Sequence, residues 1–183
     1  MAHDSLEPSA WVRRWAALVT RGPVLDVATG AGRHARLFSS LGLSVTAVDR
    51  EAQVLPKAIT FVKADLEDGS PWPFPGQRFG GIVVTNYLHR PLLPVLAQSL
   101  AEDGVLIYET FMAGNEKFGR PSNPDFLLDR GELLELAAPA SGNRLQIIAF
   151  EDGYVETPKP AVVQRVCALK CGSSFALERM RLN

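Results

Sequence analysis

The chain has 183 residues, of which 46% are hydrophobic and 21% are charged; this fits one globular domain and excludes a disordered chain. A net charge of -1, from 19 basic and 20 acidic residues, gives neither the basic footprint of a nucleic-acid-binding protein nor a polybasic membrane anchor. No run approaches the roughly 18 apolar residues of a membrane-spanning helix. The opening MAHDSLEP carries an acid and lacks an apolar stretch, so we expect no signal peptide.

Two cysteines, Cys167 and Cys171, are too few for a disulfide framework in a chain of this size. Their C-x-x-x-C spacing matches neither a zinc pair nor a redox pair. We therefore expect free thiols and a reducing, cytoplasmic setting.

The first half of the chain predicts helices and strands in alternation. Apolar residues fall on one helical face over 11–19, which predicts an N-terminal helix within a segment, 1–22, that can serve as a lid. The pattern then predicts, in order, a strand at 24–28, a helix ending at Gly42, a strand at 43–49, a short helix at 51–56, a strand at 58–65, a loop at 66–78 and a strand at 79–86.

The second half predicts helices at 91–101 and 130–138, a strand at 105–111, a polar loop at 112–125 and two final strands, RLQIIAFED and AVVQRVCALK. Strands that alternate with helices indicate an α/β fold with a doubly wound, mostly parallel sheet. We expect one domain over residues 1–183, with the last two strands paired to each other.

The segment LDVATGAGRHA links a strand to a helix and carries the strongest signal for a ligand site. Gly30 and Gly32 let the backbone approach a ligand closely, and Asp49, at the end of the next strand, can accept both hydroxyls of a ribose. Gly30, Gly32 and Ala35 match a dinucleotide pattern. However, the Asp26 carboxylate would repel a pyrophosphate, whereas it suits a ligand that carries an ammonium and a sulfonium.

The alternative interpretation is a structural turn, with Asp26 as a helix-capping acid. Against it stands the joint pattern of five residues near the carboxyl ends of successive strands, the edge at which open α/β sheets bind ligands. These residues are Asp26, Gly30, Gly32, Asp49 and Asp65.

LDVATGAGRHARLFSSLGLSVTAVDR resembles the first two motifs of class I S-adenosylmethionine (SAM) dependent methyltransferases, in particular the branch of the bacterial tellurite-resistance methyltransferases. ADLEDGSPWPFPGQRFGGIVVTNYLHRPLL and EDGVLIYETF resemble the family's third to fifth strands. The closing strands resemble the antiparallel hairpin that separates these enzymes from dehydrogenases. The resemblance implies a seven-stranded Rossmann-like sheet, with SAM as methyl donor and S-adenosylhomocysteine (SAH) as product.

The same resemblance implies a cofactor site. Asp65 and Leu66 would border the adenine, and Asn86 and Tyr87 would lie beside the methionine portion. Ala28 replaces the first glycine of the family pattern, which is tolerable if its backbone angle φ stays negative. Gly80 stands where the family usually has an aspartate. The expected cofactor residues are Asp26, Ala28, Gly30, Gly32, Arg33, Asp49, Arg50, Asp65, Leu66 and Asn86.

Three residues near the ends of the fourth and fifth strands are candidates for catalysis. His89 is the first candidate for a general base, or it orders a neighbouring loop. Tyr87 flanks the sulfonium by a cation–π contact, or it packs. Glu109 either faces the reaction or pairs with Arg120 or Arg90. No histidine or acid spacing indicates a metal site.

The acceptor pocket is expected between residues 86–90 and the loop 112–124, where Asn115, Arg120 and Asn123 either read an acceptor or satisfy the loop's own backbone. The neutral charge favours a small-molecule acceptor. Two alternatives remain: a protein or RNA methyltransferase that depends on a partner for recognition, and a SAM-binding module without catalysis.

Overall fold

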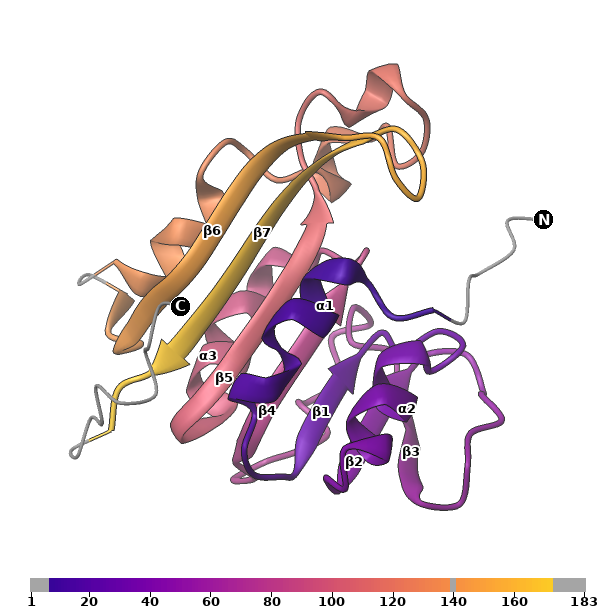
Figure 1. Cartoon of the computed structure of the whole chain (residues 1–183), viewed down its shortest axis with the longest axis vertical. Coiled ribbons are helices and arrows are strands. Elements are labelled where there is room, and N and C mark those ends of the chain that lie inside the picture. Colours follow the sequence, from indigo (N-terminus) through magenta and orange to yellow (C-terminus); the bar gives the residue numbers. More distant parts are fainter. Residues whose placement is uncertain (1–6, 139–140, 173–183) are drawn as a thin grey trace.

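The computed structural model describes residues 7–138 and 141–172, so the opening residues 1–6, on which the signal-peptide expectation rests, lie outside it. Seven strands form one sheet in the order β3-β2-β1-β4-β5-β7-β6 (Figure 1). Their bounds are β1 Val24–Val27, β2 Val45–Asp49, β3 Ile59–Lys63, β4 Phe79–Thr85, β5 Leu100–Phe111, β6 Leu145–Val155 and β7 Ala161–Lys170. The predicted seven-stranded α/β sheet is confirmed.

The central strands are parallel and apolar because helices or turns cover both faces of the sheet. All four residues of β1 are buried, and the strand pairs in parallel with β2 on one side and β4 on the other. Side chains alternate between the two faces, so Leu25 and Val27 enter one core while Val24 enters the other. At β5 the direction changes, since β7 pairs with it antiparallel and β6 closes the hairpin.

Among the residues that the structure describes, three α-helices cover the sheet: α1 Ala10–Trp15, α2 Arg33–Ser40 and α3 Leu93–Ser99. In Figure 1, α1 and α2 lie on the near face and α3 lies behind. Trp11 of α1 and Phe38 of α2 pack into one core, and Leu96 of α3 packs into the other. The sheet is therefore doubly wound, as predicted.

One predicted helix is absent and another is of a different type. Residues 51–56 contain no helix, because Val54 is 95% exposed and a single packed side chain, Leu55, does not give the segment an apolar helical face. Residues 130–138 form a 3₁₀-helix, η5 Glu132–Ala137, instead of an α-helix. Its buried side chains, Leu133 and Leu136, are three residues apart, which is the spacing that a 3₁₀ turn brings to one side. The alternation of strands and helices is thus less regular than expected.

Shorter 3₁₀ turns account for most of the other differences. They are η1 Ala16–Leu18 after α1, η2 Arg90–Leu92 before α3, and η3 Asn115–Lys117 and η4 Pro124–Phe126 in the loop after β5. Residues 100–104, predicted as helix and turn, belong to β5.

Within residues 7–138 and 141–172, no helix combines the length and apolar character needed to cross a membrane. Cys167 is buried, Cys171 is half-buried, and both are free thiols. Burial raises the pKa of the Cys167 thiol to about 12.

Candidate active site

Two pockets open at the carboxyl ends of the parallel strands. The strand-edge pocket, of about 380 Å³, is lined by residues that follow β1, β2, β3, β4 and β5. The hairpin pocket, of about 310 Å³, lies between the N-terminal segment, the end of β5 and the β6–β7 hairpin. Asn86 and Phe111 line both pockets, so the two share a wall at the ends of β4 and β5.

The carboxylate of Asp26 forms hydrogen bonds with both ends of the glycine loop. This carboxylate is 1% exposed, and its Oδ2 accepts hydrogen bonds from the Thr29 hydroxyl (2.5 Å) and the Ala35 N–H (2.9 Å). Burial raises the pKa of Asp26 to about 7, although both hydrogen bonds act to lower it. Asp26 lines neither pocket; it ties the loop to the start of α2, the capping role that was the alternative interpretation of this acid.

The loop itself turns through left-handed backbone conformations. Gly30 and Gly32 have φ of 52° and 76°, which only glycine adopts without strain. Ala28 also has a positive φ, of 51°, so the condition under which alanine would be tolerated without strain is not met. The tight turn fixes the backbone and imposes a strained conformation on the alanine.

Asp49 connects the glycine loop to the strand-edge pocket. Its Oδ2 accepts the Gly30 N–H and its Oδ1 accepts the Glu51 N–H, each at 2.9 Å. A carboxylate has about four acceptor sites, so two stay available on the residue that lines the pocket. The position and chemistry fit a ribose diol.

Tyr87 forms part of the wall between β4 and the loop after β5. Its backbone carbonyl accepts a hydrogen bond from the Tyr108 hydroxyl at 2.8 Å. Burial, together with the nearby Glu67 carboxylate, raises the pKa of the Tyr87 phenol, which therefore stays neutral. The preceding residue, Asn86, has φ of 56° and donates its N–H to the Glu109 carbonyl, which turns the chain sharply at the shared wall.

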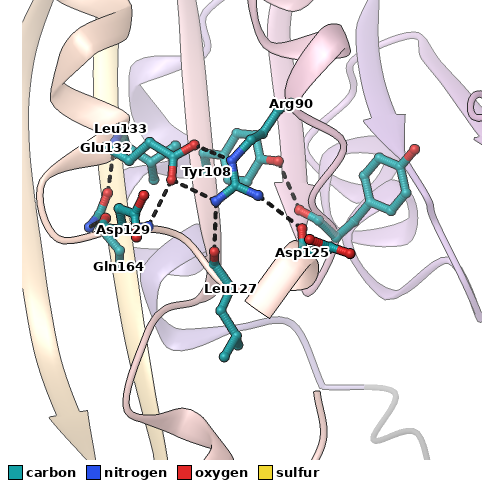
Figure 2. Close-up of polar contacts among 9 residues, drawn as sticks. Arg90, Tyr108, Asp125, Leu127, Asp129, Glu132, Leu133 and Gln164 are labelled. Atoms are coloured by element: carbon teal, nitrogen blue, oxygen red, sulfur yellow. Dashed lines mark hydrogen bonds and ion pairs between the residues drawn. The ribbon is translucent and has the colours of Figure 1, made fainter. Parts of the chain in front are cut away.

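Arg90 binds the chain segment that follows β5 through its guanidinium group (Figure 2). Its Nε and Nη2 bind the two carboxylate oxygens of Glu132 at 2.7 and 2.9 Å, and its Nη groups also donate to the carbonyls of Asp125 and Leu127. Such a bidentate pair combines strength with fixed geometry. It holds the turn containing Phe126, which lines the pocket, against the exit of β4.

A polar chain joins the N-terminal segment to the hairpin pocket. The Ser9 hydroxyl donates to Glu109 Oε1 (2.8 Å), and Glu109 Oε2 forms an ion pair with Arg165 Nε (2.5 Å). The Ser9 N–H donates to Nε2 of buried His34 at 3.1 Å. Burial, and to a lesser degree Arg33, lowers the pKa of His34 to about 3, so its ring is neutral and can accept this bond.

Comparison with known proteins adds a family similarity for part of the chain. Residues 25–105 match the methyltransferase domain family. The chain therefore contains a segment similar to a methyltransferase domain. No curated protein matches it in sequence at a significant level.

Solved structures share the fold of this chain at low identity. TehB from Haemophilus influenzae is 17% identical with a TM-score of 0.68 over 89% of this chain, and the chain spans only 62% of TehB. A SAM-dependent methyltransferase from Mesorhizobium loti is 17% identical with a TM-score of 0.67, covering 90% of this chain and 99% of the other. The 1,6-didemethyltoxoflavin-N1-methyltransferase from Burkholderia thailandensis is 18% identical with a TM-score of 0.64, covering 93% and 80%.

The structure brings most of the predicted cofactor residues together. Six of them line the strand-edge pocket: Ala28, Asp49, Arg50, Asp65, Leu66 and Asn86. Asp26, Gly30 and Gly32 build the loop beside it. Arg33 begins α2 and lines the hairpin pocket instead.

The three candidate catalytic residues line different pockets. Tyr87 lines the strand-edge pocket and Glu109 the hairpin pocket. His89 lines a separate depression with Trp72 and Leu66, and neither Asn86 nor Phe111 lines it. The partner of Glu109 is Arg165, not Arg120 or Arg90.

Two of the polar side chains in the loop after β5 form hydrogen bonds with backbone groups. Buried Asn115 donates to the Pro121 carbonyl and accepts the Val162 N–H, and Asn123 accepts the Asp125 N–H. Arg120 is exposed and lines neither pocket. Within the described part of the chain, no group of three or more histidines, cysteines or acids is arranged to hold a metal ion.

Sequence reasoning did not reveal why position 80 is glycine or which residues contact Glu109. A Cβ at Gly80 would overlap the backbone carbonyl of Arg21, so no side chain fits there. Ser9 and Arg165 reach Glu109 from distant parts of the chain, and no local pattern marks either residue.

Proposed function

We propose that the protein is a SAM-dependent methyltransferase that holds SAM in the strand-edge pocket and methylates a small molecule bound in the hairpin pocket. The observation that carries the proposal is the shared wall of Asn86 and Phe111, which places the two pockets side by side at the ends of β4 and β5. A reaction between two bound molecules requires such adjacency.

The residues of the strand-edge pocket fit the cofactor. Asp49 would hold the ribose hydroxyls, while Asp65 and Leu66 would border the adenine. Arg33, at the start of α2, would meet the carboxylate of the methionine portion. A volume of about 380 Å³ lies within the usual range for small-molecule sites. When bound, SAM supplies an activated methyl group, and the chain must align the two molecules and exclude water.

Glu109 is the proposed proton acceptor. It is 8% exposed, lines the hairpin pocket and is held in place by Arg165 and Ser9. His89 was the first candidate from the sequence, yet it lies in a different depression. Tyr87, with a neutral phenol, would contribute its ring to the cofactor side.

The small-molecule acceptor is supported by the size of the hairpin pocket and the balanced charge of the chain. The Burkholderia thailandensis structure holds 1,6-didemethyltoxoflavin and SAH. A cytoplasmic setting is supported by the two free thiols. A SAM-binding module without catalysis would bind SAM and methylate nothing, and a partner-dependent enzyme would act only after its protein or RNA partner is added.

Two variants test the assignment of the base on a panel of labelled-methyl transfer reactions. Glu109→Gln should lower turnover by about 10²–10⁴-fold, because a general base contributes that much, while SAM affinity by calorimetry stays nearly constant. His89→Ala should change turnover far less. A large loss with His89→Ala and a small one with Glu109→Gln would return the role to His89.

A further inference from the structure

We infer that the acceptor is a small apolar acid whose carboxylate binds Lys159 at the end of the hairpin pocket. This inference rests on the proposed function, because it identifies the molecule that the hairpin pocket receives. It begins from the charges that line this pocket.

Four cations and two acids line the hairpin pocket, and the acids are already paired. Glu7 pairs with Arg13 at 3.0 Å, and Glu109 pairs with Arg165 at 2.5 Å. Arg33 and Lys159 form no ion pair with any described residue. The pocket therefore has an excess of positive charge, which favours an anion and disfavours an amine.

The two unpaired cations have different places. Arg33 opens α2 directly after the glycine loop, where the proposed function assigns it to the cofactor's carboxylate. Lys159 lies in the connection between β6 and β7, and its ammonium stands 5.9 Å from the centre of the Phe111 ring. Phe111 belongs to the shared wall, so Lys159 borders the space next to the cofactor.

The rest of the wall is largely apolar. Phe111, Val155, Ala161 and Val163 line the hairpin pocket beneath Lys159. A volume of about 310 Å³ suits a compact ring or short chain rather than a polymer. An apolar body with one anionic end matches both the walls and the cation.

The inference is tested on the full chain saturated with SAH, with benzoate and benzamide as probes of equal shape and different charge. Binding is followed by nitrogen-15 chemical shifts of residues 155–163. Benzoate should bind about tenfold more tightly than benzamide, since a charged hydrogen bond replaces a neutral one. Added salt should reduce this preference.

Variants decide whether Lys159 is responsible. Lys159→Ala should abolish the preference and Lys159→Arg should keep it, whereas Lys57→Ala, at an exposed lysine outside both pockets, should change nothing. Equal affinity for the two probes, no binding of either, or a preference that survives Lys159→Ala would overturn the inference. Failure of SAH itself to bind would instead overturn the proposed function.

Discussion

The two pockets are built in different ways. Around the strand-edge pocket, polar groups meet across short stretches of chain: Asp26 binds Thr29 and Ala35, and Asp49 binds Gly30, 19 residues away. Around the hairpin pocket the contacts are long-range, since Ser9 and Glu109 are 100 residues apart. The cofactor side is thus set by a local motif, whereas the acceptor side depends on how distant segments assemble.

The largest predicted effect is on the pH dependence of stability. It comes from two buried side chains near the glycine loop whose pKa values are shifted in opposite directions. Asp26 has a folded pKa of about 7 against an ordinary value of 3.8, so its stabilisation is present below pH 3.8 and lost as pH rises to 7. His34 has a folded pKa of about 3 against 6.5, so its stabilisation is present above pH 6.5 and lost as pH falls to 3. Each is worth up to about 4 kcal/mol, and they oppose each other.

Urea unfolding between pH 4 and 6.5 measures how these two opposing contributions change the free energy of unfolding. Relative to the wild type at each pH, Asp26→Asn should lose stability toward pH 4, because only the His34 effect remains. His34→Gln should gain stability toward pH 4. Parallel profiles for the two variants would show that one of these groups is not buried as described.

Removal of the ribose ligand should weaken the cofactor side alone. Asp49→Ala should reduce SAM binding by roughly 1.5–3 kcal/mol if the carboxylate accepts charge-assisted hydrogen bonds. Calorimetry measures the change, and Asp152→Ala, at a residue that lines neither pocket, provides the control. Unchanged affinity in a folded Asp49 variant would remove this residue from the site.

The Arg90 contact is the long-range element of the cofactor side. Arg90→Lys keeps the charge but loses the fork to Glu132, and should cost about 1 kcal/mol of stability, since the Arg90 side chain is 39% exposed. SAM affinity should fall severalfold because the turn at Phe126 loosens. Arg130→Lys is the matched control, because Arg130 forms an ion pair with Asp152 while its own side chain is 84% exposed. Equal effects of the two variants would exclude a role for Arg90 in shaping the pocket.

The smallest effect is expected at Ala28. A left-handed alanine costs about 1–2 kcal/mol, of which glycine would recover part while adding unfolded-state entropy of about 0.5–1 kcal/mol. Ala28→Gly should therefore raise the free energy of unfolding by up to about 1 kcal/mol, measured by urea. A loss of stability would mean that the alanine methyl packs favourably in this turn.

These differences explain what the sequence could predict. The glycine loop, Asp49 and the central strands follow from local patterns, so six predicted cofactor residues do line one pocket. The helix predicted at 51–56 is absent, and the one at 130–138 is a 3₁₀-helix, because tertiary packing decides whether and how such short segments become helical. Ser9, Lys159 and Arg165 were missed because tertiary contacts bring them to the site, such as the pairing of Glu109 with Arg165 across β5 and β7.

The central claim is that one pocket takes the cofactor and its neighbour takes the acceptor. The most direct test is a nitrogen-15 chemical-shift titration of the full chain with SAH, with NAD as the comparison ligand. The account predicts saturable shifts with SAH at residues 28–32, 49–50, 65–66 and 86–88, with little change at 155–163 and no response to NAD. Shifts confined to the hairpin pocket, or a saturable response to NAD alone, would contradict it.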